Sequence, residues 1–397
     1  MSSHSGHALR AAMVIPWYFP HLGGAETQCA ALCSALRHVT GVHVPFLITR
    51  RIQASDPSED VVHGTRVLRL GVPGEGKLRE WAFYLAALRR LVAWRGSYDL
   101  IHCHSTSPLA LAAVVAGRLF GKPVILKLST NGDVDLLFGK RSLLPMALAK
   151  WALLRHAARH GHFVALNNEG LTELARAGAI RSRIISNGVD TAIFHMVGAD
   201  ERASLRNRFG CTARDVVLIF CGRFVRSKGV ELLLQAHAEF EHRLKERLVV
   251  WLVGDSCRKD EDLTDLIETA EASGRVRILP AVFPVAPYLQ AADLFVLPSY
   301  REGLSNAALE AIACGLPCLL SDIPSHRELA DSNPDAKVRM FRAGDVGSLR
   351  EELAVLLTAI CDTPWELRER SRLSGLLQID RVAERYEELY REAVANG

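Results

Sequence analysis

Short apolar runs alternate with longer amphipathic stretches along most of the chain. Six runs in the first half are expected strands, at residues 11–15, 42–48, 66–70, 99–103, 123–128 and 162–166. Between most of them, apolar residues recur at helical spacing. Because the runs are apolar on both faces, they are typical of buried parallel strands covered by helices.

A second series of the same kind begins after residues 186–190. Its expected strands lie at residues 215–221, 247–254, 275–279, 293–299 and 316–322. The pattern predicts an α/β fold with two Rossmann-like, doubly wound parallel-sheet domains facing a cleft. We expect domains at 1–186 and 187–375, and a charged C-terminal helix at 376–397 that crosses back to the N-terminal domain. Ligands of such sheets bind beyond the carboxyl ends of the strands.

Composition adds a charge asymmetry to this picture. The 397 residues carry a net charge of +4, yet residues 1–185 hold 22 Lys or Arg against 11 Asp or Glu, a net +11. The nine cysteines show no C-x-x-C or zinc-finger spacing, which favours core packing over a metal site. No apolar stretch is long enough for a signal-peptide core or a membrane span, so we expect a cytoplasmic protein.

Two loops at expected strand ends carry glycines in front of a helix. Gly23 and Gly24 open one helix, where free N–H groups favour an anion. They form neither a dinucleotide fingerprint nor a P-loop, and a plain tight turn remains an alternative. The second loop contains Gly222, Arg223 and Lys228. Arg and Lys suit phosphate oxygens, and the alternative is two solvated loop cations.

A third loop, within residues 297–317, places two carboxylates around a helix start. Ser305 or Asn306 is a suitable N-cap, so amides near Gly303 can face a phosphate. Glu310 lies one helical turn after Asn306, where its carboxylate could accept hydrogen bonds from two ribose hydroxyls. Glu302 stays in the loop. The alternative is that one glutamate only complements the helix dipole and the other is an ordinary surface residue.

These motifs together resemble the retaining nucleotide-sugar glycosyltransferases of family four, which have the GT-B fold. The resemblance rests on GGAE (23–26), SNGVD (186–190), GRFVRSKGV (222–230), LVGD (252–255) and EGLSNAALEAIACGLP (302–317). It implies catalytic roles for Glu302, Arg223 and Lys228, metal-independent transfer with retention, and no cofactor. It also implies a donor-binding set of Gly23, Gly24, Gly222, Arg223, Lys228, Gly254, Glu302, Gly303, Leu304, Ser305 and Glu310.

The sequence departs from the family pattern on the acceptor side. Ser129 stands where the family often has a histidine, so Lys127, Ser129 and Asp133 become candidates for sugar or acceptor contacts. His104 is a further candidate, whereas we interpret His102 as a core residue. The expected acceptor is a saccharide or a lipid-linked saccharide of cell-surface polysaccharide biosynthesis.

Two basic stretches with aromatic residues, 77–96 and 139–162, suit an anionic membrane surface. The alternative is that their apolar faces pack on the N-terminal sheet. No nucleic-acid recognition motif accompanies the positive charge. Two other functions stay open: a GT-B epimerase or phosphorylase, and a non-catalytic sugar-nucleotide-binding protein.

Overall fold

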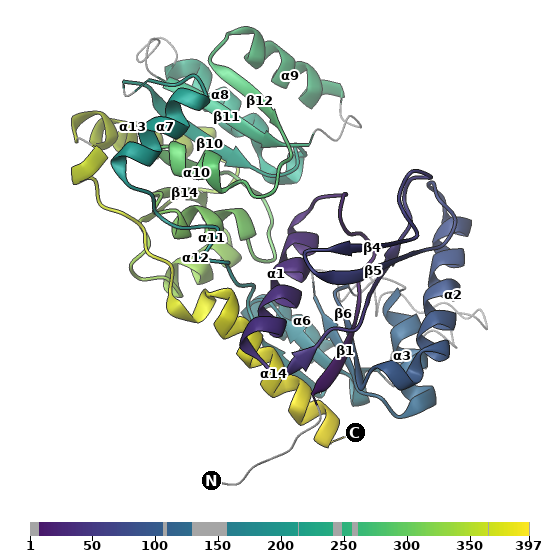
Figure 1. Cartoon of the computed structure of the whole chain (residues 1–397). Helices are drawn as coiled ribbons and strands as arrows, with labels where there is room; N and C mark the ends of the chain where they lie inside the picture. Colours follow the sequence, from purple (N-terminus) through teal and green to yellow (C-terminus); the bar gives the residue numbers. More distant parts are fainter. Residues whose placement is uncertain are drawn as a thin grey trace. The chain divides into compact units, whose positions relative to one another are not determined.

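The fold was analysed in a computed structural model, which describes residues 8–105, 109–128, 157–212, 214–240, 248–255, 261–363 and 365–396. The chain divides into two compact units (Figure 1). The first unit contains residues 1–188 and 379–397, and the second contains 189–378. The boundaries expected from the sequence, after residues 186 and 375, lie a few residues earlier. The C-terminal segment is part of the first unit and not a separate domain.

The first unit is built on one sheet, which has nine strands within the described residues. Its order is β4-β5-β3-β1-β6-β7-β8-β9, with β2 paired to β1, and every pairing except β4 with β5 is parallel. The strands are β1 (Leu9–Val14), β2 (Val42–His43), β3 (Leu47–Arg50), β4 (Glu59–Val62), β5 (Thr65–Leu70), β6 (Leu100–Cys103), β7 (Val124–Lys127), β8 (His162–Ala165) and β9 (Arg181–Ile184).

Helices cover this sheet, and the last helix of the chain lies beside the first (Figure 1). The α1 stripe that contains Cys29 and Cys33 is buried against the α14 residues Tyr386 and Tyr390, as the expected return of the C-terminal helix requires. The helices are α1 (Gly24–Val39), α2 (Lys77–Ala93), α3 (Leu109–Phe120), α6 (Asn168–Arg176) and α14 (Ile379–Ala395).

Some strand predictions for the first unit were wrong. The single strand expected at 42–48 is split into β2 and β3, and Pro45, which lies between them, has no N–H to give to a ladder. Strands β4 and β9 were missed. Strand β4 begins with two acidic residues, and two of the four residues of β9 are arginines. None of the eight residues is fully buried, so both strands lack the apolar pattern of a core strand.

The second unit has a six-stranded, fully parallel sheet of order β12-β11-β10-β13-β14-β15. The chain moves outward from β10 to β12 and then returns to the other side of β10. The strand order therefore reverses between β10 and β13, and that point is where doubly wound sheets bind ligands. The strands are β10 (Val216–Cys221), β11 (Leu248–Gly254), β12 (Val276–Pro280), β13 (Leu294–Leu297), β14 (Cys318–Ser321) and β15 (Val338–Phe341).

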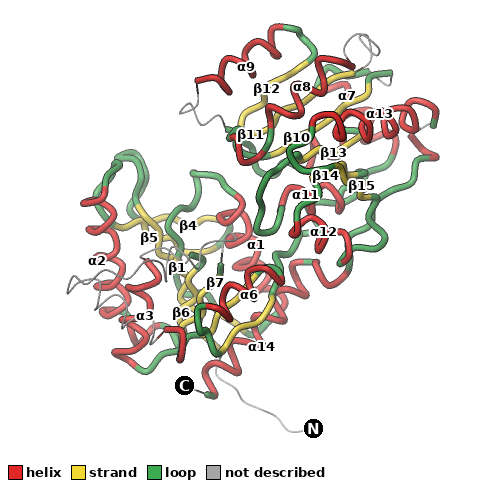
Figure 2. Tube along the Cα trace, turned by 180° about the vertical axis from the view of Figure 1, so that it is seen from behind, coloured by secondary structure: helices red, strands yellow, loops and turns green. Residues whose placement is uncertain are grey.

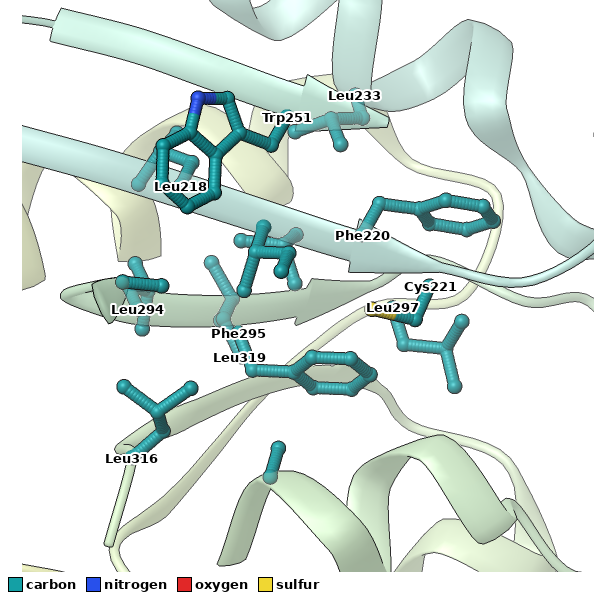
Figure 3. Close-up of a cluster of buried hydrophobic side chains, with 14 of the residues drawn as sticks. Leu218, Phe220, Cys221, Leu233, Trp251, Leu294, Phe295, Leu297, Leu316 and Leu319 are labelled. Carbon is teal, nitrogen blue, oxygen red and sulfur yellow. The ribbon is translucent and has the colours of Figure 1, made fainter. Parts of the chain in front are cut away.

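The core of the second unit follows from these apolar strands. All six residues of β10 are buried, and Figure 3 shows Leu218 and Phe220 among side chains of the neighbouring strands, including Trp251 and Phe295. Helices flank the strands of this unit (Figure 2). They are α7 (Ala199–Arg208), α8 (Val230–Phe240), α9 (Glu261–Ala272), α10 (Ala286–Ala291), α11 (Asn306–Ala313), α12 (Pro324–Asp331) and α13 (Val346–Asp362).

The described residues include no membrane-spanning helix and no disulfide bond. None of their helices combines the length and the apolar character that crossing a bilayer requires. Their eight cysteines are all free thiols, and each is buried except Cys361, which is partly exposed.

Candidate functional site

The loop after β10 depends on two glycines whose backbones nearly touch. Gly222 has φ of 154°, a conformation that favours glycine, and its N–H donates to the Val253 carbonyl oxygen at 2.9 Å. A Cβ atom on Gly254 would stand 1.8 Å from the Gly222 carbonyl oxygen. Both residues were expected to bind the donor. In this structure both allow the ends of β10 and β11 to approach closely.

Beyond Gly222, a short 3-10 turn presents Lys228. The turn covers Arg226–Lys228 and ends at Gly229, whose φ is 67°. A Cβ on Gly229 would lie 2.0 Å from the Pro298 carbonyl oxygen, so this loop packs directly on the loop that follows β13. The Tyr300 N–H donates to the Ser227 carbonyl oxygen at 3.0 Å. The loops that follow β10 and β13 are therefore held against each other by this packing and this hydrogen bond.

Lys228 and Glu302 form an ion pair across these two loops. The Lys228 Nζ atom lies 2.6 Å from Glu302 Oε1 and 2.7 Å from Oε2. The Glu302 side chain is 8% exposed and that of Lys228 is 23% exposed. The Ser299 hydroxyl also donates to Glu302 Oε1, at 2.7 Å. One oxygen of this carboxylate is thus held by two donors from opposite loops.

Behind Glu302 lies a buried polar chain that the sequence did not suggest. The Ser321 hydroxyl donates to the Ser299 carbonyl oxygen, and His326 Nδ1 lies 2.9 Å from the Ser321 carbonyl oxygen. All three side chains are fully buried. Burial lowers the pKa of His326, which favours a neutral imidazole. The one sequence signal for Ser299 is its position three residues before Glu302.

The helix α11 begins beside this pair, as expected. Ser305 is its N-cap, and its hydroxyl accepts a hydrogen bond from the Ala308 N–H at 3.3 Å. Gly303 is buried next to Ser305, and Leu304 is partly buried. The first N–H groups of a helix carry partial positive charge, so this end of α11 suits an anion.

Glu310 lies farther along α11 and is partly buried. Its carboxyl group has no hydrogen-bond or ion-pair partner among the described residues. Burial raises its pKa to about 8, and the neighbouring thiols of Cys221 and Cys314 also have pKa values raised by burial. The site therefore holds a carboxyl group that lacks a donor and would gain from two hydroxyl donors.

Arg223 differs from Lys228 in its surroundings. It follows Gly222 directly, is exposed, and makes no ion pair with any other described residue. A guanidinium without a carboxylate partner can bind phosphate oxygens in a bidentate manner. The second unit thus brings together two cations, a paired carboxylate and a helix N-terminus at one edge of its sheet.

In the first unit, Gly23 and Gly24 stand at the start of α1. Gly23 is the N-cap in extended conformation, and a Cβ there would meet the Glu26 carboxylate at 2.3 Å. The Thr27 hydroxyl donates to the carbonyl oxygens of both glycines at 3.2 Å. The N–H groups of this helix start carry the partial positive charge described for α11.

The strand ends of the first unit carry a buried polar cluster. The Tyr390 hydroxyl lies 2.6 Å from His102 Nδ1, and the rings of His102 and His104 stack with centroids 4.0 Å apart. Lys127 Nζ lies 5.7 Å from the centre of the Tyr386 ring. His104 is 4% exposed and Lys127 is 6% exposed, so these two acceptor-side candidates are buried here.

Burial sets the pKa values of this cluster. It lowers the pKa of Lys127 to about 8, and it lowers the pKa values of His102 and His104 well below the usual range. The interpretation of His102 as a core residue agrees with its full burial. The candidates Ser129 and Asp133 lie outside the described residues. The tyrosines of α14 were not foreseen, because they reach the cluster from the far end of the chain.

Comparison with known proteins agrees with this geometry. The family model described as "Glycosyl transferase 4-like domain" matches residues 23–188, and the one described as "Glycosyl transferases group 1" matches residues 215–359. D-inositol 3-phosphate glycosyltransferase 1 of Catenulispora acidiphila is 29% identical over 326 residues, which cover 76% of this chain and 74% of that protein.

Solved structures share the fold at low identity. Sucrose-phosphate synthase from Thermosynechococcus elongatus superposes with a TM-score of 0.76 and 19% identity, covering 98% of this chain and 100% of that one. Anabaena HepE in complex with UDP-glucose gives 0.69 and 16%, covering 96% and 99%. The family matches span most of both units, and the chain therefore belongs to the group 1 glycosyltransferases, with the GT-B fold and glycosyltransferase activity.

Proposed function

We propose that the second unit binds a nucleotide-diphosphate sugar and that the enzyme transfers the sugar with retention and without a metal ion. One observation carries the proposal: Arg223 and the Lys228–Glu302 pair stand together where the strand order reverses. That position is the usual ligand site of such sheets. HepE, a structural neighbour, was solved with UDP-glucose.

The donor would lie with its diphosphate against the cations. Arg223 offers a planar fork and Lys228 a point charge, and the start of α11 adds partial positive charge. Glu310, whose carboxyl group has no hydrogen-bond partner among the described residues, would accept hydrogen bonds from the ribose hydroxyls. Because those bonds favour the ionised form, nucleotide binding would release a proton near neutral pH.

Transfer would use the same groups. Breaking the anomeric C–O bond places negative charge on the leaving diphosphate, and fixed cations stabilise that charge as it develops. Arg223 and Lys228 would thereby replace the divalent metal ion that other transferases use. Glu302 would stand near the sugar ring, where its carboxylate favours oxocarbenium-like charge. Retention follows from the family resemblance.

The first unit would bind the acceptor, with His104 and Lys127 as its candidate residues among those that the structure describes. We propose a saccharide or a lipid-linked saccharide of cell-surface polysaccharide biosynthesis as the acceptor. The inositol phosphate in the name of the Catenulispora acidiphila relative supports a competing class, a small phosphorylated polyol. Both classes present a hydroxyl nucleophile.

Nucleotide binding is tested first, by thermal stabilisation with UDP, GDP and ADP. A ligand at about 100 times its Kd adds roughly 2.7 kcal/mol to the free energy of unfolding. We expect one base to stabilise the wild type and the Glu351→Ala variant, an exposed control on α13, but not Glu310→Ala. Equal stabilisation of Glu310→Ala would contradict the ribose assignment. No response to any nucleotide would contradict the donor site.

Transfer is tested next with the sugar nucleotide of that base. We expect turnover to persist in EDTA and NMR to show the donor's anomeric configuration kept in the product. Loss of activity in EDTA, restored by a divalent ion, would refute metal independence, and an inverted product would refute retention. Incubation with saccharides, lipid-linked saccharides and inositol phosphates identifies the acceptor class. Epimerised donor without transfer would favour the epimerase alternative.

A further inference from the structure

Helix α2 is apolar on two opposite faces. Phe83, Ala87 and Leu91 are fully buried in the core of the first unit. On the other side, Leu78 is 87% exposed, Trp81 is 57% exposed and Leu85 is 48% exposed. The three exposed residues recur at helical spacing and so form one stripe along the outer face of the helix. We call them the α2 stripe.

A stripe of this kind is unusual on a protein surface. Single exposed apolar residues are normal, but a contiguous patch with a large aromatic side chain marks an interaction site. The core does not require the stripe, because α2 already buries its inner face. The stripe therefore needs an occupant that accepts apolar side chains.

The charges around the stripe identify the chemistry of that occupant. Lys77 and Arg89 are exposed on this side of α2 and form no ion pair with another described residue. The one acid of the helix, Glu80, lies 3.4 Å from the buried Arg50. Apolar side chains flanked by unpaired cations fit the interface of an anionic lipid bilayer, where an indole ring is also favoured.

Two other occupants fit less well. A second copy of the chain, related by a two-fold axis with antiparallel α2 helices, would bring Lys77 of one copy near Arg89 of the other, and like charges would repel. Residues 129–156 of this chain contain four Lys or Arg and two Asp, so they would not neutralise the stripe's cations either. The other basic stretch named from the sequence, 139–162, lies largely outside the described residues.

We propose that the α2 stripe docks the first unit on an anionic phospholipid surface. The helix would lie in the interface plane, with Leu78, Trp81 and Leu85 among the acyl chains and the cations against the headgroups. This docking is independent of the donor site in the second unit, and its failure would leave the proposed transfer chemistry in place.

The test is co-sedimentation of the full chain with vesicles of phosphatidylcholine, with and without phosphatidylglycerol. We expect the wild type to bind the anionic vesicles and to dissociate at high salt. The variant Leu78→Ser/Trp81→Ser/Leu85→Ser should bind at least ~10-fold more weakly. A control variant, Ile180→Ser/Leu376→Ser, removes two residues of 70% and 71% exposure outside α2 and should bind normally.

A second measurement ties binding to the stripe itself. The variant Trp81→Phe should still bind but lose most of the fluorescence quenching that brominated lipids cause. Absence of vesicle binding by the wild type would overturn the proposal, and so would equal binding by the triple serine variant. A concentration-dependent dimer that the triple serine variant abolishes, without vesicle binding, would assign the stripe to a second copy instead.

Discussion

The interaction between Lys228 and Glu302 can be measured by replacing Lys228 with methionine and Glu302 with glutamine, singly and together. An exposed ion pair contributes roughly 0.2–1 kcal/mol, whereas removing one partner of a buried pair costs about 3–5 kcal/mol. The Glu302 side chain is 8% exposed and that of Lys228 is 23% exposed, so this pair lies between the two limits. We expect a coupling free energy of about 1–2 kcal/mol.

The assay is urea unfolding of the four proteins followed by tryptophan fluorescence, to which the buried Trp251 of the second unit contributes. The double-mutant cycle cancels the separate effects of each substitution. The pair Arg381–Glu384 on α14 is the control, because its side chains are 64% and 41% exposed. Its coupling free energy should be close to zero, because solvent screens both charges.

The salt dependence of the coupling free energy also distinguishes the two ion pairs. Screening weakens interactions between exposed charges much more than between buried ones, so the Lys228–Glu302 coupling should survive in molar salt. A coupling no larger than that of Arg381–Glu384 would refute the reasoning. Glu302 would then depend on Ser299 and solvent, and the ion pair could not be what fixes its carboxylate.

Three further predictions concern other parts of the chain. Burial raises the pKa of Glu310 in the folded state from 4.5 to about 8. Its contribution to stability is therefore full below pH 4.5, decreases as pH rises, and is lost once pH has passed through 8. The urea midpoint should fall with pH over this range, and it should fall less in Glu310→Gln. Gly254→Ala places a Cβ against backbone and should cost about 2–4 kcal/mol in urea unfolding, whereas Gly96→Ala, with open space around it, should be nearly neutral. Tyr390→Phe removes the hydrogen bond to His102 and should lower the unfolding free energy by about 1–3 kcal/mol. Tyr386→Phe removes a hydroxyl without a partner among the described residues and should cost less than about 0.5 kcal/mol; equal losses in the two variants would contradict this.

The parts of the fold that local patterns determine were predictable. The buried strands of both sheets are apolar on both faces, and the N-cap at Ser305 follows from its residue type in front of a helical pattern. The glycine and cation motifs after β10 and β13 were found because ligand loops follow the carboxyl ends of parallel strands. The sequence alone thus placed Arg223, Lys228 and Glu302 in loops at strand ends of the second sheet, where the structure also has them.

What the sequence could not provide are contacts between distant segments. Ser321 stabilises the loop of Ser299 from a neighbouring strand, and Tyr390 reaches His102 from 288 positions along the chain. Neither contact joins residues at a helical or strand spacing, so no sequence pattern predicts it. The short strand β15 was missed for a different reason: one of its four residues is fully buried, so it lacks the apolar character of a core strand.

Burial also separates two lysines that look alike in the sequence. Lys127 ends a strand of the first sheet and Lys228 lies in a loop at a strand end of the second. Lys127 is 6% exposed with a pKa lowered to about 8, so the charge of its amine depends on pH near neutrality. Lys228 faces the Glu302 carboxylate beside the exposed Arg223. In the proposed function, the cations that meet the diphosphate are those of the second unit, Arg223 and Lys228. A ligand that reaches Lys127 would meet an amine that can lose its proton, which suits contact with hydroxyl groups better than with phosphate.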